Sequence, residues 1–277
     1  MKVLNSNKVS ETDFFTVCFT PRSFGAGTSL AALGTFLPAS LRLRLCLAVQ
    51  KRTQNHPGHA VIRKPGEKSG LAARRVLDAG LAELDPGLDE TIKETLLGYV
   101  DLLVRWNRSF NLTGTKEPAE IVRRHLLDSL SIAPFLRGAR VLDAGTGAGL
   151  PGLVLAAARP RIGFTLLDSS GKKTRFCLQA TAELALRNVR VVRARLEAYE
   201  PEVPFTCVVS RAFDSTADLM AKCRHLLAPG GVVLAMKGAY PKEELEALET
   251  AGRSARVLPL SVPELGADRH LLLVEAS

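Results

Sequence analysis

One stretch of this 277-residue chain, VLDAGTGAGLPG at residues 141–152, constrains the fold more than any other. An aliphatic run ends at Asp143, and four glycines then fall within eight positions, at 145, 147, 149 and 152. A glycine inside a helix or strand destabilises it by about 0.5–1 kcal/mol relative to alanine, so such a cluster needs a compensating role. The pattern predicts a strand, a tight turn and a helix, with a main chain that a bound ligand approaches closely.

Short apolar runs alternate with helical stretches after Gly138, and this alternation predicts the fold class. We expect a Rossmann-like α/β fold, in which a seven-stranded, mostly parallel sheet carries helices on both faces. The last two apolar runs are separated only by VPELGADR, too short for a crossover helix, which predicts an antiparallel C-terminal hairpin at the sheet edge. The predicted strands are 140–143, 163–168, 189–194, 205–210, 232–237, 255–260 and 270–275, and the predicted helices are 151–159, 171–187, 215–227 and 241–252.

Residues 71–138 predict a helical cap ahead of this core, which we place at 139–277. Apolar residues spaced by three and four run from Ile92 to Val104 and form one stripe on a helix that ends near Trp106. A second helix is expected over 121–136, because Pro118 just ahead of it is a helix start signal.

Residues 1–70 have a different character. They hold ten Lys and Arg against three acidic residues, +7 of the net charge of +9, so the remainder of the chain carries only +2. Pro and Gly are scattered through them, and Arg42 and Arg44 interrupt their apolar run, which disfavours a membrane span. Three interpretations stay open: a poorly ordered extension or upstream translation start, an organelle-targeting segment, and a basic arm for RNA. The first is favoured because regular amphipathicity is missing.

Composition narrows the class of protein. Apolar residues make up 46% and charged residues 23%, as in ordinary globular proteins. The five cysteines show neither a close pair nor a nearby histidine pair, so we expect no metal site and no disulfide framework. A reducing, cytoplasmic setting fits this cysteine usage. No self-pairing motif stands out, so a monomer is expected.

The glycine-rich turn and the next strand together predict the cofactor. Leu150 stands where the dinucleotide fingerprint requires its third glycine, which argues against a pyrophosphate. Asp168 ends the second predicted strand, where a carboxylate accepts hydrogen bonds from both ribose hydroxyls of an adenosine. Adenosine without a diphosphate indicates S-adenosylmethionine, with Gly145 and Gly147 against its methionine portion. The alternative for Asp168 is a cap for the helix that starts at Gly171.

The end of the fourth predicted strand indicates the kind of methyl acceptor. An amino-group methylase is expected to show Asn or Asp, then Pro-Pro and an aromatic, whereas this chain has Ser210, Arg211, Ala212 and Phe213. A pyrimidine-carbon methylase needs a cysteine nucleophile, but Cys207 lies mid-strand and is expected to be buried. A purine ring nitrogen has an available lone pair and needs no general base, so catalysis becomes positioning and charge placement.

Six ordered blocks carry a resemblance to a known family. The chain is similar to the bacterial small-subunit ribosomal RNA guanine-N7 methyltransferases, methyltransferase G, also called glucose-inhibited division protein B. The resemblance covers roughly residues 71–277 and implies methyl transfer from S-adenosylmethionine to N7 of one guanosine in 16S rRNA. It implies naked rRNA or a small-subunit assembly intermediate as the partner. The blocks are NLTGTKEPAEIVRRHLLDSL, VLDAGTGAGLPG, TLLDSSGKKTRF, ARLEAY, VVSRAF and AMKG.

The resemblance also implies site residues. For Arg211 a structural ion pair and a direct role near cofactor or target both stay open, and only the direct role would make it catalytic. The implied cofactor contacts are Gly145, Leu150, Asp168, Ser169, Ser170, Leu196, Glu197 and Arg211. The candidate RNA contacts are Arg123, Arg124, His125, Lys172, Lys173, Arg195 and Lys237. A small-molecule methyltransferase and a non-catalytic RNA-binding protein stay open as other classes.

Overall fold

The computed structural model describes residues 67–213 and 215–276. The prediction of a poorly ordered extension over residues 1–70 lies outside this part of the chain, except that residues 67–70 belong to a helix. The described elements all belong to one compact unit. Among these elements, none is a helix with the length and apolar character needed to cross a membrane.

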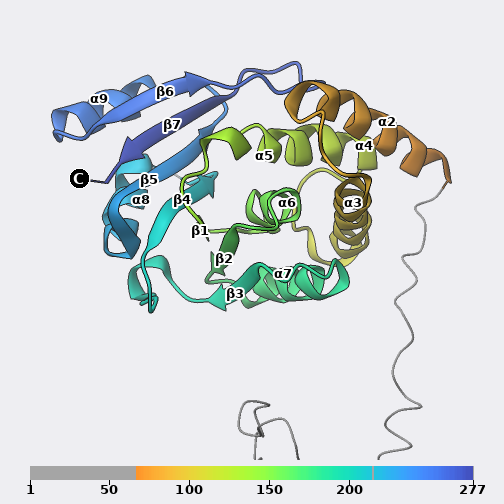
Figure 1. Cartoon of the computed structure of the whole chain (residues 1–277), viewed down its shortest axis with the longest axis horizontal. Coiled ribbons are helices and arrows are strands. Elements are labelled where there is room, and N and C mark those ends of the chain that lie inside the picture. Colours follow the sequence, from red (N-terminus) through yellow and green to blue (C-terminus); the bar gives the residue numbers. More distant parts are fainter. Residues whose placement is uncertain (1–66, 214, 277) are drawn as a thin grey trace, which may run out of the picture. The chain divides into compact units, whose positions relative to one another are not determined.

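A seven-stranded sheet forms the centre of this unit, in the order β3-β2-β1-β4-β5-β7-β6 (Figure 1). The first five strands pair in parallel, whereas β7 is antiparallel to both β5 and β6, so the expected Rossmann-like sheet and its C-terminal hairpin are confirmed. The order reverses between β1 and β4, and ligands of open α/β sheets bind beyond the carboxyl ends of strands at such a point. The strands are β1 (Arg140–Ala144), β2 (Gly163–Asp168), β3 (Val189–Arg193), β4 (Phe205–Arg211), β5 (Leu227–Lys237), β6 (Ala255–Pro259) and β7 (His270–Glu275).

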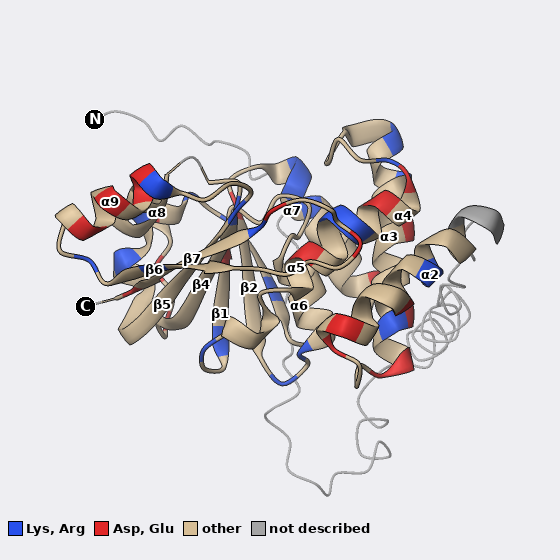
Figure 2. Cartoon of the chain, turned by 90° about the horizontal axis from the view of Figure 1, so that it is seen from above, with Lys and Arg blue, Asp and Glu red and all other residues tan. Residues whose placement is uncertain are grey.

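Helices cover both faces of the sheet, because successive side chains of a strand point to opposite faces and both faces carry apolar residues. One face packs α6 (Gly152–Ala158), α7 (Gly171–Glu183) and the cap into a single apolar core (Figure 1). The other packs α8 (Thr216–Cys223) and α9 (Lys242–Thr250) into a smaller one, and Figure 2 shows these two helices on the side of the sheet away from α6 and α7. Neighbouring residues of β1 divide between the two cores, Val141 in the larger and Leu142 in the smaller, which is the period of two that a strand imposes.

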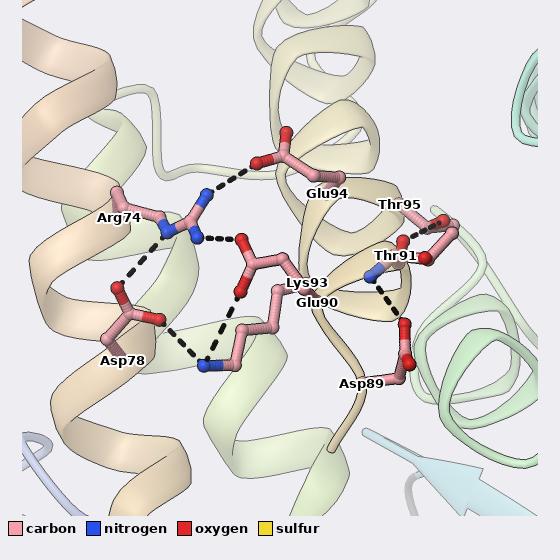
Figure 3. A network of polar contacts seen from close by, with 8 residues as sticks. All are labelled: Arg74, Asp78, Asp89, Glu90, Thr91, Lys93, Glu94 and Thr95. Carbon is pink, nitrogen blue, oxygen red and sulfur yellow. Dashed lines mark hydrogen bonds and ion pairs between the residues drawn. The ribbon is translucent and has the colours of Figure 1, made fainter.

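The cap contains a helix that the apolar pattern did not single out, α2 (Glu67–Leu84), followed by α3 (Glu90–Phe110). Helix α2 buries Ala73, Leu77 and Leu81, a stripe spaced by four residues. Gly80 lets α2 approach the cap segment that contains Leu127 closely, because a Cβ on Gly80 would lie 2.4 Å from a methyl carbon of Leu127. At the surface, Arg74 of α2 pairs with Glu90 and Glu94 of α3 (Figure 3).

The second cap helix is not the single helix expected over 121–136. It is divided into α4 (Pro118–Ile121), a π-helical stretch η2 (Val122–Leu127), α5 (Asp128–Leu130) and a 3-10 turn η3 (Ala133–Phe135). Pro118 does begin it, and the Glu117 side chain caps it by accepting from the Glu120 amide. Apolar spacing of three and four cannot distinguish a π-turn from an α-turn, because both present one buried side.

Two core helices end earlier than predicted. Helix α7 stops at Glu183, and Ala185 then adopts a φ of +53°, a left-handed conformation that ends a helix. Helix α8 stops at Cys223, and a 3-10 turn η5 (Arg224–Leu226) leads into β5. Strand β5 begins at Leu227, five residues before its predicted start.

Candidate active site

The glycine-rich turn after β1 folds back on the end of β2. The amides of Gly145 and Thr146 both donate to the Leu167 carbonyl, at 2.9 and 3.0 Å. Gly145 has a φ of +70°, and a Cβ placed on it would meet nothing within 4 Å. The left-handed backbone favours glycine there, and the space that a side chain would occupy is left open for a ligand.

Asp143 holds the two ends of this turn together from inside the protein. Its Oδ2 accepts from Thr146 Oγ1 at 2.5 Å and from the Gly152 amide at 2.8 Å, while its Oδ1 is buried with no hydrogen-bond partner in the described part of the chain. Complete burial raises the pKa of Asp143 to about 6, against the opposing effect of these two hydrogen bonds. Asp143 therefore shapes the loop and is not exposed to a ligand.

Asp168 at the end of β2 joins the glycine turn to the next helix. Its Oδ2 accepts from the Gly147 amide at 3.0 Å, and its Oδ1 accepts from the Ser170 amide at 2.8 Å. Lys173 Nζ lies 3.6 Å from Oδ2. Ser170, not Asp168, occupies the N-cap position of α7. Each carboxylate oxygen can accept two hydrogen bonds, so acceptor capacity remains for ribose hydroxyls.

A cavity of about 360 Å³ opens between these strand ends. This volume lies within the range of small-ligand pockets. Six of the expected cofactor residues line it: Gly145, Asp168, Ser169, Leu196, Glu197 and Arg211. The other three do not line it: the Gly147 amide is bonded to Asp168, Leu150 is 3% exposed within the core, and Ser170 begins α7.

Several further residues line this cavity without having been predicted as cofactor contacts, and three of them carry a charge or an aromatic ring: Phe213, Asp218 and Lys222. Lys222 Nζ lies 2.7 Å from Asp218 Oδ2, 3.5 Å from Glu197 Oε1 and 5.6 Å from the centre of the Phe213 ring. The Lys222–Glu197 contact joins the last turn of α8 to the turn η4 (Leu196–Ala198). Both charges and an aromatic ring therefore line this part of the cavity.

Arg211 stands at the end of β4, where the cavity meets the cap. Its Nη1 lies 3.5 Å from Asp128 Oδ2, and Arg269 Nε from the β6–β7 hairpin lies 3.0 Å from Asp128 Oδ1. Asp128 is 4% exposed. Burial raises its pKa, while the two guanidiniums oppose that shift. The ion pair expected for Arg211 is present, and Asp128 orients a guanidinium that also lines the cavity.

His125 lies on the other side of Arg211, with its Nδ1 3.3 Å from Arg211 Nη1. Burial and the neighbouring guanidinium lower the pKa of His125 to about 4, so the ring is neutral at physiological pH. Its Nε2 is buried and lacks a hydrogen-bond partner among the described residues.

Comparison with known proteins identifies the family. The family model "rRNA small subunit methyltransferase G" matches residues 92–272. A ribosomal RNA small subunit methyltransferase G from Nitrosococcus oceani is 48% identical over 197 residues, covering 71% of this chain and 92% of that protein. One from Vibrio vulnificus is 45% identical over 204 residues, covering 73% and 97%. This chain belongs to the rRNA small subunit methyltransferase G family.

Solved structures give a weaker comparison. A glycopeptide N-methyltransferase, MtfA, crystallised with S-adenosyl-L-methionine, is 15% identical, with a TM-score of 0.48 over 54% of this chain and 86% of that one. The assignment to the methyltransferase G family depends on the sequence matches and not on this likeness. The match begins at Ile92, so helix α2 precedes it.

The candidate RNA cations of this methyltransferase G family member are mostly engaged within the protein. Arg123 and Arg124 both pair with Glu120, and Lys237 pairs with Glu244 at 2.7 Å. Lys172 Nζ donates to the Phe110 carbonyl. Figure 2 shows basic and acidic segments interspersed over the cap helices. Of the predicted set, Lys173 and Arg195 line the cavity, and His125 and the Arg124 carbonyl contact Arg211, which lines it as well.

The described cysteines lie in the interior of the protein. Cys177, Cys207 and Cys223 are all buried, and burial raises the pKa of each thiol. Cys207 is fully buried, as expected for a small apolar side chain and not for a nucleophile. Within residues 67–213 and 215–276, no group of His, Cys, Asp and Glu side chains could hold a metal ion.

Proposed function

We propose that this protein transfers a methyl group from S-adenosylmethionine to N7 of a guanosine in 16S rRNA. The observation that carries this proposal is the cavity between the glycine turn and Asp168, in a chain that belongs to the methyltransferase G family. When bound, S-adenosylmethionine supplies an electrophilic methyl group on a sulfonium.

Residues of the cavity fit that cofactor. The open space at Gly145 admits the methionine portion against the main chain, and Asp168 retains acceptor capacity for the ribose hydroxyls. We expect Leu196 and Glu197, which line the same cavity, to lie beside the adenine. These contacts orient the cofactor and exclude water from one side of it, which is the positioning that a lone-pair acceptor requires.

Guanine N7 suits a site without a general base. Its lone pair attacks directly, so no proton has to be removed before transfer. Arg211 lines the cavity and contacts the neutral His125 of the cap, and we propose that Arg211 acts there through charge and position. We propose 16S rRNA or a small-subunit assembly intermediate as the partner. We also propose that the protein acts as a monomer in the cytoplasm.

Two measurements test this function. Saturation with S-adenosylmethionine at a hundred times its dissociation constant is expected to stabilise the fold by about 2.7 kcal/mol in a thermal shift assay. Tritium from labelled cofactor is expected to enter 16S rRNA from subunits that lack the modification. Absence of stabilisation contradicts the enzyme and favours a non-catalytic RNA-binding protein. Label in small molecules but not in RNA contradicts the proposed substrate.

A further inference from the structure

Arginines follow the edge strand of the sheet. Among the described strands, β3 pairs only with β2, and four arginines lie in and around it, in the sequence LRNVRVVRARL. No acidic residue interrupts residues 184–196. All four side chains are exposed, and Figure 1 shows β3 at the end of the sheet, beside α7. Because side chains alternate along a strand, Arg193 lies on the α7 face and Arg190 on the opposite face, so the arginines border both sides of this edge. The arginines are Arg187, Arg190, Arg193 and Arg195, and we call them the β3 arginine track.

The arginines of the track lack the ion-pair partners that several of the cations predicted from sequence have among the described residues. Arg123, Arg124 and Lys237 pair with carboxylates, whereas no track guanidinium forms an ion pair with any carboxylate of the described residues. Among the described hydrogen bonds of the track side chains, there is one long contact of 3.5 Å, from Arg193 Nε to the Ser169 carbonyl. The track therefore keeps its charge available to an external anion.

A groove receives the side chains at one end of the track. It has a volume of about 360 Å³ and lies at the first residues of β1 to β4, away from the cofactor cavity. Arg187, Arg190 and Arg140 line it together with one carboxylate, Glu202. Arg140 is held in place, because its Nη2 donates to the Val203 carbonyl at 2.8 Å. Three guanidiniums against one carboxylate favour an anionic occupant.

The groove exists because one crossover of the sheet lacks a helix. The connection from β3 to β4 contains only the short turn η4, whereas the other parallel crossovers carry α6, α7 and α8. Arg190 and its partner Thr165 on β2 consequently border a groove and not a helix.

The other end of the track reaches the cofactor. Arg195 lines the cofactor cavity beside Leu196. Strand β3 covers only Val189–Arg193, so the eight steps from Arg187 to Arg195 span at most about 26 Å. A single-stranded RNA segment of a few nucleotides spans such a length, as in other grooves that follow a nucleic-acid backbone.

We propose that the β3 arginine track and the groove at its far end bind the phosphodiester backbone of the RNA strand that leads to the methylated guanosine. This inference rests on the proposed function. Arginine presents a planar fork that matches phosphate geometry, and no ion pair with a described carboxylate occupies that fork in the track. The RNA then contacts the protein on both sides of η4, with the target base at the cavity and the flanking strand along β3.

Charges on an edge strand also have a competing role, since they prevent pairing with the edge of another sheet. That role alone requires no RNA contact. It predicts self-association when the arginines are removed, and no change in the salt dependence of RNA binding.

The experiment compares two double variants of the full chain. Arg187→Gln with Arg190→Gln removes two track charges outside the cofactor cavity. Arg75→Gln with Arg224→Gln removes two exposed arginines of α2 and η5 that form no ion pair with the described carboxylates. The dissociation constant for a 16S rRNA transcript is measured by filter binding between 50 and 200 mM KCl, alongside self-association by gel filtration and cofactor affinity by calorimetry.

We expect the salt slope of the track variant to fall by about 1.4, since each phosphate contact to a single strand contributes roughly 0.7. Its affinity should weaken on the order of tenfold, with unchanged cofactor affinity, while the control variant matches the wild type. Equal salt slopes of RNA binding in the wild type and both variants would overturn the proposed RNA contact, whether or not the track variant self-associates. Equal losses of RNA affinity in the track and control variants would overturn it as well. Methyl transfer to rRNA by the wild type is measured separately. If transfer fails but the track variant still shows a reduced salt slope of RNA binding, the proposed function is contradicted and the RNA contact at β3 is not.

Discussion

Asp143 and Asp168 end neighbouring strands, yet they act on the site differently. Asp143 is fully buried and bonded to both ends of the glycine turn. Asp168 is bonded to the turn and to the start of α7 and also lines the cavity. One carboxylate shapes the main chain, and the other connects that shape to the ligand.

Replacement of Asp168 by alanine is therefore expected to weaken S-adenosylmethionine binding at least tenfold. The change removes the acceptor for the ribose and leaves the amides of Gly147 and Ser170 without a partner, at a cost of about 1–3 kcal/mol for each amide left buried. Calorimetry measures the affinity, and circular dichroism checks that the fold is retained. Asp268→Ala, at an exposed position, is the matched control. Unchanged affinity in Asp168→Ala would show that the ribose lies elsewhere.

Asp143 predicts a pH dependence of stability. Its pKa is raised from 3.8 to about 6, so between these values the unfolded chain has released a proton that the folded protein retains. The free energy of unfolding therefore falls as pH rises through this window, by about 2.4 kcal/mol between pH 4 and 7. Urea unfolding of the wild type and Asp143→Asn at both pH values isolates this contribution. A difference between the two proteins that stays constant with pH contradicts it.

The local sequence was sufficient to predict the site residues that lie directly at or after the end of a strand. Asp168 and Gly145 were predicted from their positions after β2 and β1, and both line the cavity. Lys222 and Phe213 were not, because α8 and the end of β4 meet only in the folded chain. The roles of the predicted site residues in binding stay predictions.

At the scale of elements, two kinds of interaction join α2 to the rest of the cap. Its apolar stripe packs into the core, and Arg74 forms ion pairs with Asp78, Glu90 and Glu94 at the surface (Figure 3). These hydrogen-bonded carboxylates raise the pKa of Arg74, most of all Glu90. Exposed ion pairs contribute little in water, so burial is expected to dominate.

Two variants separate these contributions. Leu77→Ala, at a fully buried position, is expected to destabilise by about 2–5 kcal/mol at any salt concentration. Arg74→Met is expected to cost at most about 1 kcal/mol at low salt, and less in 1 M NaCl. Urea unfolding at both salt concentrations measures the two losses. A salt-sensitive loss in Arg74→Met larger than the loss in Leu77→Ala would show that the surface network is what holds α2.

Helices and strands were predictable where their apolar residues formed a clear run or repeat in the sequence. Every predicted strand is present, because runs such as GFTLLD are buried and bounded by turns. The stripe of α2 was missed, since Ala73 and Gly80 contribute close packing without a strong apolar signal. The π-helical stretch Val122–Leu127 could not be predicted, because it depends on backbone hydrogen bonds and not on side-chain spacing.

At the scale of the whole molecule, the chain divides into residues 1–59 and residues 60–277, and only the second unit contains described elements. We expect deletion of residues 1–59 to leave the unfolding midpoint and the cofactor affinity unchanged, because the family match begins at Ile92. Scanning fluorimetry and calorimetry against the full chain check this. A midpoint lowered by more than about 4 °C contradicts it. Lost rRNA affinity at an unchanged midpoint would identify a basic RNA arm instead.

One contact gives the cap a role beyond covering the sheet. The Tyr99 hydroxyl of α3 donates to the Ala148 carbonyl of the glycine turn at 2.8 Å, and Tyr99 is 2% exposed. The turn is thus supported from two directions, by the strands behind it and by a phenol from the cap. A displacement of α3 would therefore be transmitted to the glycine turn, whose Gly145 lines the cavity, so an RNA that contacts the cap and a ligand in the cavity would act on the same loop.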